Sequence, residues 1–91
     1  MAKTLFGLAF SEGATDFLDR MSSGKIRAQV AKKAKSLIHD PHPPGCRKLV
    51  GFMDNEEDVW RVRSGDYRIL YVMRPHEVIV IDIGHRKDVY R

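Results

Sequence analysis

Hydrophobic and polar positions repeat with two different periods along this 91-residue chain. Some segments alternate with period two or form short apolar runs, which is typical of β-strands, and others repeat every three or four residues, as amphipathic helices do. The expected strands are residues 3–10, 47–50, 59–63, 66–74 and 77–84, and the expected helices contain residues 14–21 and 25–39. The pattern predicts an α+β fold, ordered β-α-α-β-β-β-β, with a two-helix antiparallel hairpin packed on a mostly antiparallel sheet.

Residues that start or stop helices mark the ends of these segments. Ser11 is placed to cap the first helix, which ends at Ser22-Ser23-Gly24. The proline-rich segment 40–45 ends the second helix, because proline cannot continue one. We expect an acidic loop at residues 53–58 and place the apolar run 78–83 inside the sheet. The expected apolar face of the second helix is Ile26, Val30, Ala34, Leu37 and Ile38.

Length and composition narrow the class of protein. A chain of 91 residues is expected to form one domain spanning residues 1–91. No apolar stretch is long enough to span a membrane. Cys46 is the single cysteine, which excludes an internal disulfide and favours a reducing, cytoplasmic setting.

The basic residues gather in the middle of the chain. The formal net charge is +4, yet residues 20–48 alone contain eight Lys or Arg and one Asp. Such a basic stripe suits a phosphate backbone, although a solvated helix face explains the charge count equally well.

The strands at 59–63 and 66–74 place arginines on one face of the sheet. Strand side chains alternate, so Arg61 and Arg63 share a face. If Ser64-Gly65 is a two-residue hairpin loop, Arg61 stands opposite Arg68. Like charges placed opposite each other destabilise a sheet, so this arrangement favours a shared anion. The alternative is that Asp66 or the acids of residues 54–58 neutralise these arginines.

Polar groups also follow the last strand. His85, Arg86 and Lys87 are expected at one rim of the sheet, where a histidine can exchange protons near neutral pH or be purely structural. Tyr90 follows them, in a position with little support for a core role. His39 and His42 have no evident third ligand, so we expect no metal site, and no cofactor-binding motif is present.

The chain resembles the RelE/ParE toxin superfamily, and in particular the RelE-like mRNA interferases of type II toxin–antitoxin systems. The residues that carry the resemblance are Lys48-Leu-Val-Gly51, Trp60-Arg-Val-Arg63, Gly65-Asp-Tyr-Arg-Ile-Leu-Tyr71 and Gly84-His-Arg-Lys-Asp-Val-Tyr90. The last block is similar to RelE rather than to the gyrase-poisoning ParE relatives.

The resemblance implies a ribosome-dependent, metal-independent endoribonuclease that cuts mRNA in the ribosomal A site. In that reaction the 2′-hydroxyl attacks the adjacent phosphate and the 5′-oxygen leaves. Carried over by position, Arg61 and Arg68 hold the phosphate, and Arg86 acts near the leaving group. Tyr90 stacks on a base or transfers a proton, and His85 is a candidate general acid or base. The implied RNA- and ribosome-binding residues are Lys25, Arg27, Lys32, Lys33, Lys35, Arg47, Lys48 and Arg63.

The resemblance also implies partners and leaves alternatives. A cognate antitoxin would cover the toxin, and their complex would bind operator DNA. Val59 stands where RelE has a lysine, so one cation expected in the active site is missing. The alternatives are a ParE-like inhibitor of DNA gyrase, or a catalytically inactive member that binds antitoxin or nucleic acid.

Overall fold

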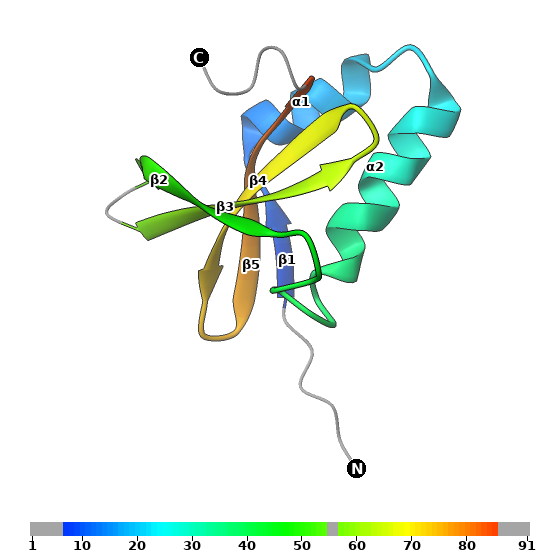
Figure 1. Ribbon diagram of the computed structural model, residues 1–91. Coiled ribbons are helices and arrows are strands. Elements are labelled where there is room, and N and C mark those ends of the chain that lie inside the picture. Colours follow the sequence, from blue (N-terminus) through cyan, green and yellow to red (C-terminus); the bar gives the residue numbers. More distant parts are fainter. Residues whose placement is uncertain (1–6, 55–56, 86–91) are drawn as a thin grey trace.

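The computed structural model describes residues 7–54 and 57–85 and has the predicted order of elements (Figure 1). The α+β class is confirmed, with two helices and a five-stranded sheet in the described residues. The elements are β1 (Gly7–Phe10), α1 (Glu12–Arg20), α2 (Gly24–Ser36), β2 (Arg47–Asp54), β3 (Glu57–Ser64), β4 (Tyr67–Arg74) and β5 (Glu77–His85).

The five strands form one mixed sheet in the order β1-β5-β4-β3-β2. β1 runs parallel to β5, and the other neighbours are antiparallel, as predicted. β5 lies between β1 and β4, so the expectation that the apolar run at 78–83 is inside the sheet is confirmed. Both helices cover one face, α1 over β1 and β5 and α2 over β3 and β4 (Figure 1).

Serine side chains cap both helices. The Ser11 Oγ accepts a hydrogen bond from the Ala14 N–H at 3.1 Å, which confirms the predicted cap. The same hydroxyl donates to the Ile81 carbonyl at 2.8 Å and so ties the start of α1 to β5. Ser23 caps α2 by accepting from the Ile26 N–H at 3.2 Å. Each cap satisfies a backbone donor that has no partner within the helix.

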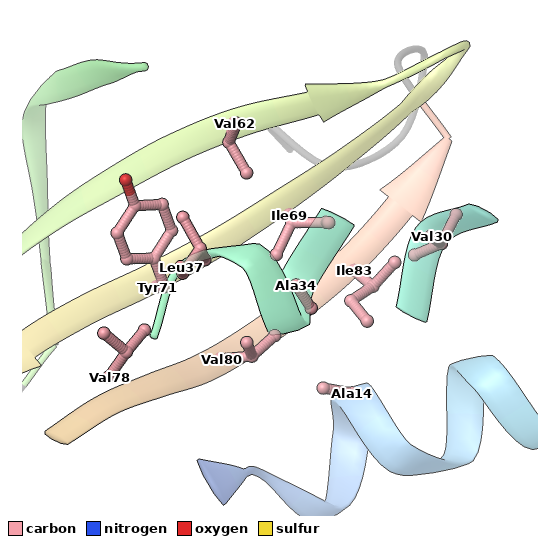
Figure 2. Close-up of a cluster of buried hydrophobic side chains, with 10 residues drawn as sticks. All are labelled: Ala14, Val30, Ala34, Leu37, Val62, Ile69, Tyr71, Val78, Val80 and Ile83. Carbon is pink, nitrogen blue, oxygen red and sulfur yellow. The ribbon is translucent and has the colours of Figure 1, made fainter. Parts of the chain in front are cut away.

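The main core lies between the helices and the sheet. Figure 2 shows its side chains pointing toward one another from α1, α2 and strands β3 to β5. Val30, Ala34 and Leu37 are fully buried there, as the helical pattern predicts. Ile26 was expected on the same face but is 37% exposed, and it lies in the first turn of α2. A smaller cluster of Val59, Leu70 and Val72 lies on the other face.

The predicted acidic loop at residues 53–58 is wrong in its extent. β2 continues to Asp54 and β3 begins at Glu57, with Asp54 opposite Glu57 in the register. Two ion pairs hold acids of this region: Glu57 lies 3.1 Å from the Arg74 guanidinium, and Asp58 lies 3.5 Å from the Lys48 ammonium. No helix in the described part of the chain is long and apolar enough to cross a membrane.

Candidate anion-binding site

The hairpin of β3 and β4 sets the positions of the arginines. Its loop is Gly65-Asp66, because Ser64 pairs with Tyr67 and Arg63 with Arg68. The expected loop at Ser64-Gly65, and with it the pairing of Arg61 with Arg68, is therefore wrong by one residue. Tight hairpin turns require a positive φ at their first central residue, and Gly65 supplies it with φ of +59°. Arg61 instead stands opposite Leu70.

The corrected register still leaves the arginines on one face. Arg61, Arg63 and Arg68 all lie on the face of the sheet away from the helices, and Arg63 and Arg68 are now directly opposite. Arg61 is only 7% exposed. The Arg68 Nε is buried and has no hydrogen-bond partner among the described residues. A buried guanidinium donor without an acceptor is costly unless an anion binds there, so this face is suited to phosphate.

A β-bulge in β5 brings a carboxylate to the same face. Leu70 pairs with Asp82 and Tyr71 with Val80, so Ile81 is an extra residue. By simple alternation Asp82 would share the helix-covered face with Val80, but the bulge turns it to the arginine face, diagonally across from Arg68. Sequence reasoning missed Asp82; an acid within an otherwise apolar run was the available signal.

Four of the predicted cationic residues surround one hollow. Lys33, Arg47, Arg61 and Arg63 line a space of about 220 Å³ between α2, the segment Pro44-Gly45 and the outer edge of β3. β2 begins at Arg47, opposite Arg61, and β3 continues beyond that point to Ser64. The edge of β3 that β2 leaves uncovered is therefore the floor of the hollow.

The segment beside the hollow is fixed to the core by a tyrosine. The Tyr71 hydroxyl donates to the Pro41 carbonyl at 2.8 Å, and its ring is fully buried. Burial raises the pKa of the Tyr71 hydroxyl well above its usual range, and the Cys46 thiol adds to this shift. Tyr71 therefore remains neutral and acts as a hydrogen-bond donor to the loop.

Other predicted residues lie elsewhere. His85 pairs with Tyr67 and contacts its ring edge-on at 5.5 Å, on the face that carries the helices, so the structure does not bring it to the arginines. Lys48 lies beside Asp58. Lys32 lines a second hollow with Ser64. Lys25, Arg27 and Lys35 are exposed on α2. Arg86 and Tyr90 lie outside the described residues.

Among the described residues, no three His, Cys, Asp or Glu side chains lie close enough together to hold a metal ion. What the geometry provides is a cationic face with a buried arginine, Arg61, a half-buried one, Arg68, and one nearby carboxylate. Such a site is able to bind a phosphate and to stabilise negative charge that develops on it.

The sequence matches the model of the ParE toxins of type II toxin–antitoxin systems (parDE) over residues 8–90. The chain belongs to this toxin family of the RelE/ParE superfamily. It is therefore a toxin of a type II toxin–antitoxin system. The resemblance read from the sequence is confirmed at the level of the superfamily. No curated protein matches the sequence.

Solved structures of RelE toxins have the same fold. The archaeal RelE–RelB complex from Pyrococcus horikoshii is 19% identical with a TM-score of 0.75, covering 93% of this chain and 99% of that one. RelBE2 from Mycobacterium tuberculosis is 23% identical with a TM-score of 0.74, covering 96% and 98%. The intact E. coli RelBE complex is 26% identical with a TM-score of 0.69, covering 88% and 95%. This member of the toxin family therefore has a RelE-like fold.

Proposed function

We propose that this toxin is an endoribonuclease that cleaves mRNA in the ribosomal A site and so inhibits translation. The observation that carries the proposal is the gathering of Arg61, Arg63 and Arg68 on one sheet face, where the buried Arg68 Nε has no acceptor among the described residues. The likeness to E. coli RelE supports it. The reaction is metal-independent: the 2′-hydroxyl attacks the adjacent phosphate, and the 5′-oxygen leaves.

The cationic residues have the main chemical task in this reaction. As the 2′-oxygen attacks, negative charge grows on the non-bridging phosphate oxygens, and guanidinium donors already in place stabilise it without reorganisation. Arg68 is assigned the role of stabilising this charge. Arg61 lies diagonal to it on the same face and is assigned to assist it. Arg86 and Tyr90 are assigned to the leaving group and to base stacking or proton transfer. The assignment of His85 to proton transfer stays a prediction, and its contact with Tyr67 gives it no support.

The proposed partners follow from the family and its relatives. The relatives from P. horikoshii, M. tuberculosis and E. coli are toxin–antitoxin complexes, so we assign this toxin a cognate antitoxin. We assign operator DNA to the complex, ribosome and mRNA to the free toxin, and the cytoplasm as the site of action. The exposed lysines of α2 are suited to contact ribosomal RNA, because a phosphate backbone attracts clustered cations.

The test compares Arg68→Gln with Arg74→Gln on programmed ribosomes under single-turnover conditions. Removing one donor to a developing oxyanion lowers the rate by about 10² to 10³. Arg74 is exposed and paired with Glu57 at the other end of β4, so its variant loses the same charge far from the site and should cleave at the wild-type rate. Equal rates for a folded Arg68→Gln protein and the wild type would remove Arg68 from the mechanism.

A second candidate is inhibition of DNA gyrase, because the matching family model is that of ParE toxins. In that case the protein is a binding protein, and its arginines contact the target without bond cleavage. A gyrase supercoiling assay separates the two candidates. Inhibition of supercoiling with mRNA left intact would select the gyrase inhibitor.

A further inference from the structure

The hollow at the edge of β3 places Lys33 and Arg47, to which the proposed cleavage reaction gives no role, beside Arg61 and Arg63. Its cationic lining is Lys33 from α2, Arg47 from the start of β2, and Arg61 and Arg63 from β3, and no acidic residue of the described ranges lines it. The space of about 220 Å³ equals roughly seven times the ~30 Å³ that a water molecule occupies in the liquid. This is enough room for a phosphate group and part of its sugar.

The arrangement opposes like charges in the sheet. Arg47 stands directly opposite Arg61 in the register of β2 and β3, a placement that destabilises an antiparallel pair. Neither Lys33 nor Arg47 makes a salt bridge within the described residues. Residue arrangements that lower the stability of the fold in this way are usually functional, because binding of an anion offsets the repulsion between the like charges.

The hollow is distinct from the position of Arg68. Arg68 does not line it; it lies one strand further into the sheet, between Arg63 and Gly84 in the register. Arg61 lies diagonal to Arg68 and also lines the hollow, so it lies between Arg68 and the rest of the hollow's lining. A ligand that reaches both needs more than one anionic group along its length.

A second hollow lies beside the first along α2. It has a volume of about 330 Å³ and is lined by Gln29, Lys32, Lys33, Ser36 and Ser64. Lys33 lines both spaces. The second lining combines a further lysine with neutral hydrogen-bonding side chains, which suits the sugar hydroxyls and phosphates of a nucleic acid strand better than a single small anion.

We propose that Lys33, Arg47, Arg61 and Arg63 form a separate phosphate-binding site that holds an RNA backbone phosphate next to the one that Arg68 contacts. This site rests on the proposed function only for the identity of the RNA, since phosphate binding is measurable without cleavage. Arginine forks match phosphate oxygens in two hydrogen bonds, and the chain supplies three arginines and a lysine around one space. Arg47 is a binding residue here and takes no part in bond cleavage.

The test is made on the full-length protein with an RNA hexamer that carries 2′-O-methyl groups, which lacks the attacking hydroxyl. Amide NMR signals of Gly45, Arg47 and Arg63 are expected to shift with the hexamer and, more weakly, with inorganic phosphate. Arg47→Gln should weaken hexamer binding about tenfold or more, because one charge-assisted hydrogen bond is lost. The matched variant Arg74→Gln should change it less than twofold. Equal effects of the two variants would overturn the site.

Kinetics and a competing probe separate this site from the proposed function. On programmed ribosomes Arg47→Gln should raise KM and leave kcat unchanged, whereas loss of kcat would overturn its role as a binding residue. Hexamer-induced shifts at Gly45 and Arg47 in a wild-type protein that cleaves no mRNA would support the site and refute the nuclease. Tighter binding of hexaglutamate than of the RNA hexamer at these residues would overturn the RNA assignment in favour of an acidic protein segment.

Discussion

Replacing Tyr71 by Phe tests how the loop beside the candidate site is held. The ring of Tyr71 is fully buried, and its hydroxyl donates to the Pro41 carbonyl at 2.8 Å. Phenylalanine keeps the ring, so no cavity forms, but the hydrogen bond is lost and a partly buried carbonyl is left without its donor. This costs about 1–2 kcal/mol of folding free energy. For a domain of this size the midpoint of thermal unfolding should fall by roughly 5–15 °C.

Tyr67→Phe is the matched control. The Tyr67 ring packs edge-on against Phe17 and His85, and the described residues offer its hydroxyl no hydrogen bond. Loss of this hydroxyl should change the free energy of unfolding by no more than about 0.5 kcal/mol. Differential scanning calorimetry of both variants makes the comparison. Equal losses in the two proteins would refute the idea that the Tyr71 hydroxyl fixes the loop.

The same substitution has a pH signature. Burial raises the pKa of the Tyr71 hydroxyl above the value of about 10 that it has in an unfolded chain. The unfolded state therefore loses its proton first, so the stability that this group contributes is complete below pH 10 and is lost as the pH rises above it. The slope reaches about 1.4 kcal/mol per pH unit. Tyr71→Phe should lose stability less steeply than the wild type above pH 10; parallel curves would contradict the burial of the hydroxyl.

Three further predictions concern the fold and the charge. Ser11→Ala removes both the α1 cap and the bond to Ile81 and should cost about 1–3 kcal/mol in chemical denaturation; an effect near zero would contradict the cap. Leu37→Ala leaves a cavity in the main core and should cost about 2–5 kcal/mol in the same assay, whereas Ile26→Ala should cost far less. Affinity for single-stranded RNA should fall roughly 50-fold between about 50 and 200 mM salt for four phosphate contacts, and titrations with a flat salt dependence would count against them.

Much of the fold was predictable because its signals are local. Ser11 caps a helix through its own side chain, and Val30, Ala34 and Leu37 repeat at helical spacing, so three-dimensional context is not needed to place them. The resemblance to the superfamily rested on continuous blocks such as residues 65–71 and is confirmed by the family match.

The site was harder to predict because it depends on register. Placing the hairpin loop one residue early moved the partner of Arg61, yet the error kept Arg61 and Arg68 on the same face, because each strand's alternation was unchanged. The bulge at Ile81 is different, since one extra residue moves everything after it to the other face. Asp82 therefore lies on the arginine face, and His85 lies on the face that carries the helices. The hollow lies between α2 and β3, which tertiary packing brings together. The spacing of residues along the sequence does not show which helix will lie beside which strand.

The most direct test of the proposed nuclease is a cell-free translation reaction to which the purified toxin is added, with mRNA ends mapped by primer extension. We predict cuts within codons on translated messages, lost when Arg68 is replaced by glutamine and retained when Arg74 is replaced. Intact mRNA in a reaction with the folded wild-type toxin would contradict it.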